Sequence, residues 1–222
     1  MDRVLEPELM EDEAQALAYA KADFDAPNRS FVEGLAARFP DLPARLHAVD
    51  LGCGPADILI RLAQRHPGWR FEGIDGSPAM LHHGRVAVAA RALGEQVRLH
   101  TSRVPDVPAG LPVADLVLSN SLLHHLPDPR VLWETIRRVG APGAAIYVVD
   151  LLRPASPDAA AALVRQWSGD EPEILQRDFL ASLAAAFEVA EVEAQLQRAG
   201  LTGLVVEVIS DRHLRVTGHL PR

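Results

Sequence analysis

The sequence predicts an α/β domain in which a mainly parallel β-sheet is covered by helices on both faces. From residue 46 onward, short and almost wholly apolar segments alternate with helical stretches. Parallel strands are almost wholly apolar because crossover helices bury them on both faces. The length of 222 residues suits one large domain, and 48% hydrophobic with 23% charged residues suits a chain that buries a core.

Residues 1–45 predict a helical N-terminal arm ahead of this domain. Apolar positions recur at helical spacing over 14–20 and 31–39. Asn28 or Ser30 is expected to cap the second of these helices, and the prolines at 40 and 43 end it. We expect the arm to act as a lid on the domain formed by residues 46–222.

Seven strands and the helices between them follow from the change in periodicity along the chain. The strands are expected over 47–51, 69–74, 96–100, 115–119, 144–150, 204–209 and 214–217, with helices over 56–64, 79–92 and 128–139. Pro55 suits the first positions of the first helix, and Ser77 with Pro78 predicts an N-cap and first turn for the second.

The C-terminal part combines an Ala-rich helical stretch with a hairpin. Residues from 151 to 201 are helical in pattern, broken at 168–172, and we expect an insertion of about 152–180 to complete the lid. The last two strands are separated by too few residues for a crossover helix, so they form an antiparallel hairpin. The predicted sheet therefore has six parallel strands and an antiparallel last strand.

Gly52 and Gly54 directly follow the first strand and identify a candidate ligand site. Ligands of open parallel sheets bind outside the carboxyl ends of the strands, and glycines let the backbone turn sharply and approach them. The second strand ends at Asp75, whose ionised carboxylate only accepts hydrogen bonds. It can take both ribose hydroxyl protons of an adenosine, so the pattern favours a nucleoside ligand.

Asp57 argues against a dinucleotide at this turn. The pyrophosphate fingerprint G-x-G-x-x-G requires glycine where this chain has Asp57. A carboxylate in the first helical turn suits the helix dipole but repels a pyrophosphate docked there. S-adenosylmethionine contains a nucleoside without phosphates and escapes this conflict.

Three runs at strand ends carry a resemblance to a known family. They are Val49–Pro55, Gly73–Leu81 and Leu118–Asp128. In this order they resemble the class I S-adenosylmethionine-dependent methyltransferases, in particular the small-molecule branch that includes quinone-biosynthesis C-methyltransferases. The resemblance covers residues 46–150 and implies a Rossmann-like doubly wound fold, with a methyl group passing from S-adenosylmethionine to a small-molecule acceptor by in-line displacement.

The resemblance also implies roles for individual residues. Residues near the methionine part and ribose of the cofactor would be Asp50, Gly52, Cys53, Gly54 and Asp75. Gly76 and Ser77 would lie near the adenine, Asn120 by the cofactor tail, and Tyr19 would close over the cofactor. The family often has an acid after the third strand; here the stretch reads Thr101-Ser102-Arg103, and Ser102 is the expected substitute.

His124 and His125 are the candidate catalytic residues. The resemblance implies that His124 or His125 faces the methyl-transfer region, where an imidazole orients a hydroxyl or acts as general base. Because one of two adjacent residues usually points away from a site, we expect only one to face the substrate. A metal on His124, His125, Asp128 and Asp150 fits no ligand template, so no metal is predicted.

The composition argues against some classes of binding partner and favours one cellular compartment. A net charge of −8 and 5% aromatic residues argue against nucleic-acid binding. The acidic N-terminus has no signal-peptide pattern, no apolar run spans a membrane, and one cysteine suits the cytoplasm. A homodimer stays open. Two other functions also stay open, namely a nicotinamide-dependent oxidoreductase and a catalytically silent cofactor-binding protein on the same fold.

Overall fold

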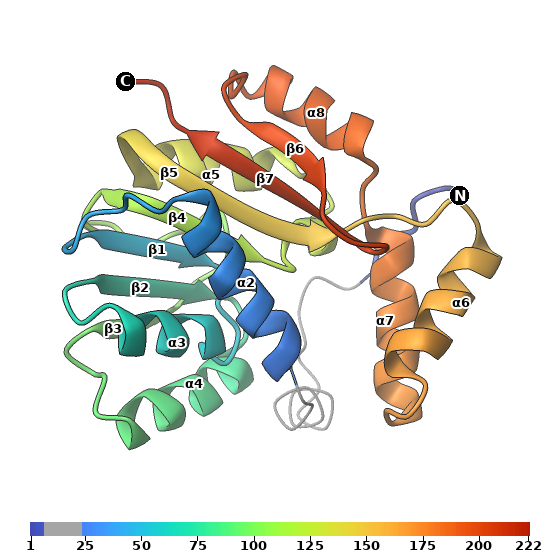
Figure 1. The fold of residues 1–222 in the computed structure, drawn as a ribbon, viewed down its shortest axis with the longest axis horizontal. Helices are drawn as coiled ribbons and strands as arrows, with labels where there is room; N and C mark the ends of the chain where they lie inside the picture. Colours follow the sequence, from blue (N-terminus) through green and yellow to red (C-terminus); the bar gives the residue numbers. More distant parts are fainter. Residues whose placement is uncertain (7–23) are drawn as a thin grey trace.

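The computed structural model describes residues 1–6 and 24–222, and its centre is a seven-stranded sheet of order β3-β2-β1-β4-β5-β7-β6 (Figure 1). Strands β1 to β5 are parallel to one another, and β7 runs antiparallel to both β5 and β6. The prediction of six parallel strands and an antiparallel last strand is confirmed. The strands are β1 (His47–Leu51), β2 (Arg70–Asp75), β3 (Val97–Thr101), β4 (Ala114–Asn120), β5 (Gly140–Leu151), β6 (Val205–Val208) and β7 (His213–His219).

Helices cover both faces of this sheet, as the apolar strands predict. Alternate residues of a strand point to opposite faces, and in β4 Leu116 packs with one hydrophobic cluster while Val117 packs with the other. Residues of α2 (Asp25–Arg38), α3 (Asp57–Arg65) and α4 (Pro78–Ala90) belong to the first cluster. Residues of α5 (Arg130–Val139) and α8 (Val189–Arg198) belong to the second.

Two of the three helix starts differ from the prediction. Ser77 caps α4 by accepting from the Met80 amide, with Pro78 in the first turn, as predicted. Pro55 instead precedes α3, which begins at Asp57 after Ala56 in a left-handed conformation. Asn28 and Ser30 cap nothing, because α2 already begins at Asp25 and both lie within it. Its buried Phe31, rather than a capping side chain, fixes this helix to the sheet by an edge-on contact with Tyr147.

The helical stretch after β5 contains α6 (Pro157–Ser168) and α7 (Glu173–Ala185), which pack on each other beside the carboxyl end of the sheet (Figure 1). Leu151, Ala160, Val164, Leu183 and Ala186 form a small hydrophobic cluster of their own there. Residues 1–6 lie along α7, where the Val4 amide donates to the Ala184 carbonyl at 3.0 Å. The helix expected over 14–20 lies outside the described residues.

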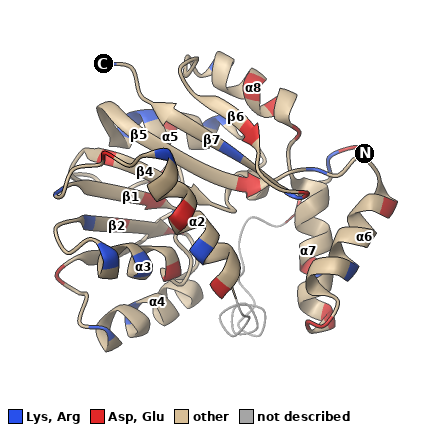
Figure 2. Cartoon of the chain, viewed as in Figure 1, with Lys and Arg blue, Asp and Glu red and all other residues tan. Residues whose placement is uncertain are grey.

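Charges of both signs are intermingled over the described elements (Figure 2). On one side of the sheet, α3 combines Asp57 with Arg65, and on the other side α8 combines Glu191 with Arg198. None of the described helices is both long and apolar enough to cross a bilayer.

Candidate functional site

A cavity of about 800 Å³ lies at the carboxyl ends of the parallel strands, where open sheets bind ligands. This volume is within the range of small-molecule sites. Tyr19 lies outside the described residues. All other residues predicted for the site line this cavity: Asp50, Gly52, Cys53, Gly54, Asp75, Gly76, Ser77, Ser102, Asn120, His124 and His125.

The turn after β1 is built by left-handed glycines. Gly52 has φ +78° and Gly54 has φ +52°, a region that L side chains rarely adopt. A Cβ at Gly52 would meet Leu122 at 3.0 Å, whereas one at Gly54 would meet nothing within 4 Å. The backbone at Gly54 therefore borders open space in the cavity, as a ligand-contacting turn requires.

Asp75 ties this turn to the start of α4. Its Oδ2 accepts from the Gly54 amide and its Oδ1 from the Ser77 amide, both at 2.8 Å. Burial raises the pKa of Asp75, and these two backbone hydrogen bonds oppose the rise. Each carboxylate oxygen has a second lone pair, so Asp75 can hold the turn and still accept two hydroxyl groups from a ligand.

Asp50 is a carboxyl group that the fold keeps close to neutrality. It is 2% exposed on β1, and burial together with the charge of Asp75 raises its pKa to about 7. A cation placed next to it would favour the ionised form. Without such a cation, the ionised form of Asp50 lowers the stability of the folded protein.

We expect Asp50→Asn to stabilise the protein at pH 8. The unfolded-state pKa is 3.8 and the folded-state pKa about 7, so the ionised Asp50 opposes folding increasingly as pH rises between these values. The full shift corresponds to at most about 4 kcal/mol. Thermal unfolding should show a higher midpoint for the variant at pH 8 and a smaller difference at pH 5. An equal difference at both pH values would contradict the raised pKa.

Cys53 and Ser102 line the cavity with their polar atoms already engaged. Burial first, then the charges of Asp50 and Asp75, raises the pKa of the Cys53 thiol well above 9.0, which disfavours its thiolate form. The Ser102 hydroxyl donates to the Asp106 carbonyl, and its amide donates to the Asp75 carbonyl at 2.9 Å. Ser102 thus fixes the loop after β3 rather than presenting a free hydroxyl.

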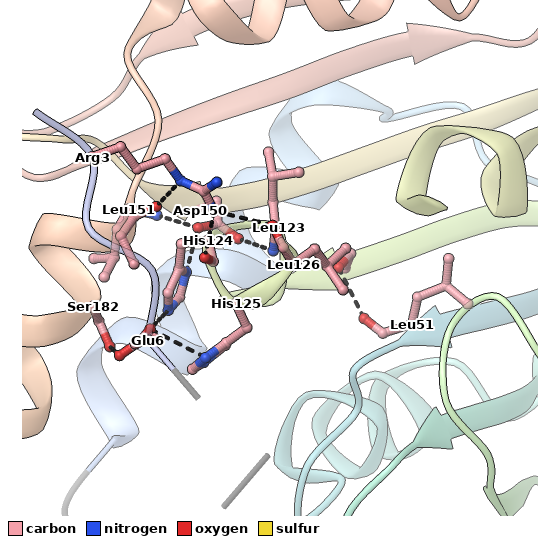
Figure 3. A network of polar contacts seen from close by, with 12 residues as sticks. Arg3, Glu6, Leu51, Leu123, His124, His125, Leu126, Asp150, Leu151 and Ser182 are labelled. Atoms are coloured by element: carbon pink, nitrogen blue, oxygen red, sulfur yellow. Dashed lines mark hydrogen bonds and ion pairs between the residues drawn. The ribbon is translucent and has the colours of Figure 1, made fainter. Parts of the chain in front are cut away.

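The other end of the cavity holds both histidines (Figure 3). They belong to one 3₁₀ turn, Leu123–His125, with ring centroids 4.2 Å apart. Both histidines line the cavity, and which of them faces a substrate stays a prediction. Glu6 lies between them, with Oε1 3.4 Å from His124 Nε2 and 3.1 Å from His125 Nδ1.

Asp150, at the end of β5, orients His124. Its Oδ1 accepts from His124 Nδ1 at 2.6 Å, and its Oδ2 accepts from the Leu123 amide at 2.7 Å. Burial alone would lower the pKa of His124, but the charge and hydrogen bond of Asp150 outweigh burial and raise it. Burial would likewise raise the pKa of Asp150, and His124 lowers it. Asp128, considered with Asp150 as a metal ligand from the sequence and set aside, pairs with Arg130 on the surface.

Several residues that line the cavity or contact its lining were not predicted from the sequence. Glu6 reaches the histidines from the N-terminal segment, and no motif marks it. Arg212 and its neighbours reach the cavity from the β6–β7 turn, where Arg212 stacks on Trp167 at 3.6 Å and donates to Asp211 at 2.9 Å. The turn signal at residues 210–212 predicted a hairpin, but only the packing of that hairpin against α6 places it at the cavity.

Comparison with known proteins identifies relatives of this chain. A family model described as a methyltransferase domain matches residues 49–146. A trans-aconitate 2-methyltransferase of Methylobacterium nodulans is 34% identical over 200 residues, covering 86% of this chain and 69% of that protein. One of Methylobacterium radiotolerans is 35% identical over 51% of this chain, and the match spans 41% of that protein's length.

Solved structures with the same fold have low sequence identity to this chain. A putative S-adenosyl-L-methionine-dependent methyltransferase of Methanococcus maripaludis has a TM-score of 0.72 at 17% identity, covering 99% of this chain and 98% of that one. The plantazolicin methyltransferase BpumL, in complex with a substrate analogue and SAH, has a TM-score of 0.68 at 15% identity, covering 95% and 97%. At this identity the match concerns the fold.

Proposed function

Because this chain belongs to the class I S-adenosylmethionine-dependent methyltransferases, we propose that it transfers the methyl group of S-adenosylmethionine to a small-molecule acceptor. The single observation that carries the proposal is the cradle of Asp75, Gly54 and Ser77. There a partly buried carboxylate accepts from the amides of the glycine turn and of Ser77 and keeps acceptor capacity for two ribose hydroxyls.

At the glycine-turn end of the cavity, separate groups of residues suit the ribose, methionine and adenine portions of S-adenosylmethionine. We propose that Asp75 binds the ribose and that Gly52, Cys53 and Gly54 border the methionine portion. Asp50, whose pKa of about 7 leaves it ready to ionise, faces the cationic groups. Gly76 and Ser77 lie on the adenine side, Ser102 supports that side through its loop, and Asn120 at the end of β4 lies by the cofactor tail.

Methyl transfer from S-adenosylmethionine requires the protein mainly to position the acceptor and the cofactor. The bound sulfonium supplies an already activated methyl group, and transfer is an in-line displacement. The chain's part is to hold the acceptor in line and to keep water out. We propose that the acceptor lies at the end formed by His124 and His125 and that both touch it. The arm of residues 1–45 and the insertion of about 152–180 are proposed to close over it as a lid.

The acceptor itself is proposed only as a class. Trans-aconitate, the acceptor in the relatives' names, carries three carboxylates, whereas the lid side of this cavity contains Glu171, Asp178 and Asp211. Arg212 is already paired with Asp211. Apolar residues complete that side, among them Trp167, Leu175 and Phe179. These lining residues favour an acceptor with an apolar body over a tricarboxylate. We also propose that the protein acts in the cytoplasm.

Titration calorimetry with S-adenosylmethionine, its demethylated product and NAD tests the proposal. We expect the first two to bind and NAD to bind at least about a hundredfold more weakly, because Asp57 occupies the first turn of α3 and repels a pyrophosphate. Binding of NAD without binding of S-adenosylmethionine would favour an oxidoreductase. Cofactor binding without transfer to any acceptor of a broad panel would favour a silent binding protein.

A further inference from the structure

We propose that Glu6, His124 and His125 bind a divalent first-row transition metal, with Zn²⁺ as the preferred ion, at the acceptor end of the cavity. The three residues come from two places that the sequence separates widely, the N-terminal segment and the turn after β4 (Figure 3). The sequence prediction of no metal rested on spacing, and spacing cannot detect a ligand so far upstream.

Glu6 Oε1 stands at metal-ligand separations from the two imidazole nitrogens, and the three candidate ligand atoms gather in one place. Glu6 Oε1 lies 3.4 Å from His124 Nε2 and 3.1 Å from His125 Nδ1, and the three atoms all lie within 4.8 Å of one another. Ligands bound at about 2.0–2.2 Å in tetrahedral or octahedral geometry stand roughly 3.0–3.5 Å apart. Both measured separations from Glu6 fall in this interval.

Hydrogen bonding does not account for the position of Glu6 Oε1. This buried atom accepts no hydrogen bond from the residues that the structure describes, although two imidazole nitrogens stand close by. Its nitrogen neighbours approach it at poor hydrogen-bond angles or distances. Its contacts in the structure are the two ion pairs with the imidazoles, and a cation between the three atoms would add a direct bond to this buried carboxylate oxygen.

Contacts behind the ligands hold them in place, as in established metal sites. Asp150 Oδ1 accepts from His124 Nδ1 at 2.6 Å, which leaves Nε2 of the same ring for the metal. Ser182 Oγ donates to Glu6 Oε2 at 3.2 Å, which leaves Oε1 for the metal. Arg3 donates to the His124 carbonyl at 2.9 Å and so fixes the turn to the N-terminal segment.

Two imidazoles and one carboxylate form a ligand set that catalytic zinc sites use, with a further position left open. Here His124 and His125 line the cavity, so the open position faces it. If the protein is a methyltransferase as proposed, this position would take a hydroxyl oxygen of the acceptor and lower its pKa, so that its proton is released to water. The resulting oxyanion would form the bond to the methyl carbon as the bond from that carbon to the sulfonium sulfur breaks, leaving a neutral thioether. This second step rests on the proposed function, whereas metal binding does not.

The test measures zinc binding to the chelator-treated full chain without cofactor. We expect one Zn²⁺ per chain by calorimetry, and a tetrahedral absorption spectrum when Co²⁺ replaces it. His125→Ala and Glu6→Gln should each weaken binding at least tenfold. His82→Ala is the matched control, because His82 and His83 form the other adjacent histidine pair, with ring centroids 5.8 Å apart on α4; it should bind zinc as the parent does.

Thermal unfolding separates a lost ligand from a lost fold. Zinc should raise the unfolding midpoint of the parent and of His82→Ala, but not of Glu6→Gln. Binding that persists in both His125→Ala and Glu6→Gln, or that falls equally in His82→Ala, would overturn the site. S-adenosylmethionine titrated into the same metal-free samples tests the proposed function separately, since its half of the cavity contains none of the three ligands.

Discussion

Replacing Asp75 with alanine is expected to weaken S-adenosylmethionine binding by at least about 100-fold. A hydrogen bond to a charged group contributes about 1.5–3 kcal/mol, and two ribose hydroxyls would lose such a partner. About 3 kcal/mol corresponds to a hundredfold change in the dissociation constant. The substitution also removes the acceptor that joins the Gly54 and Ser77 amides, so the turn itself loosens. Titration calorimetry measures the change.

Asp57→Asn is the matched control for this experiment. Asp57 also lines the cavity, so its replacement removes the same charge from the same region, but it does not contact the glycine turn through a hydrogen bond in the described residues. It should change the affinity by less than about threefold. Asp75→Asn keeps the shape of the side chain and should give an intermediate loss. Affinity unchanged in Asp75→Ala, with the fold intact, would remove Asp75 from the cofactor site.

Replacing Asp150 with alanine is expected to destabilise the protein by about 3–5 kcal/mol, the cost of removing one member of a buried charged pair. Asp150 is 1% exposed and accepts from the Leu123 amide, the Leu151 amide and His124 Nδ1. All three donors would be left inside the protein without this acceptor. Chemical denaturation at pH 7 gives the free energy of unfolding for comparison.

Asp128→Ala provides the comparison for Asp150, since both acids lie near the histidines in the sequence or in space. Asp128 is exposed and pairs with Arg130 on the surface. Such pairs contribute about 0–1 kcal/mol, so this variant should unfold almost as the parent does. Equal losses in the two variants would show that Asp150 does not organise the turn of residues 123–125.

The glycine-turn side of the cavity could be predicted to form one site because its signals are local. Gly52, Gly54 and Asp75 stand at the ends of two neighbouring strands, and parallel strands bring their carboxyl ends to one edge. The prediction of a doubly wound sheet is confirmed, and so is the resemblance to class I S-adenosylmethionine-dependent methyltransferases. The quinone-biosynthesis branch stays a prediction, as do the roles of the individual residues.

The acceptor half could not be predicted because its contacts are not local. Glu6 meets His125 only through the packing of residues 1–6 along α7. Both histidines reach the cavity from the 3₁₀ turn Leu123–His125, which sequence periodicity does not reveal. The start of α2 at Asp25 could not be predicted for the same reason, because the non-local burial of Phe31 against Tyr147 outweighs the capping preference of Asn28.

The small hydrophobic cluster of α6 and α7 has a consequence for how such proteins diverge. Its five buried residues are separate from the two clusters that hold the sheet, and the methyltransferase-domain match ends at residue 146, before this hairpin begins. Mutations in α6 and α7 are therefore expected to cost the sheet and the glycine turn little stability. If the proposed function holds, the acceptor side of the cavity can change in this way without disturbing the proposed cofactor side.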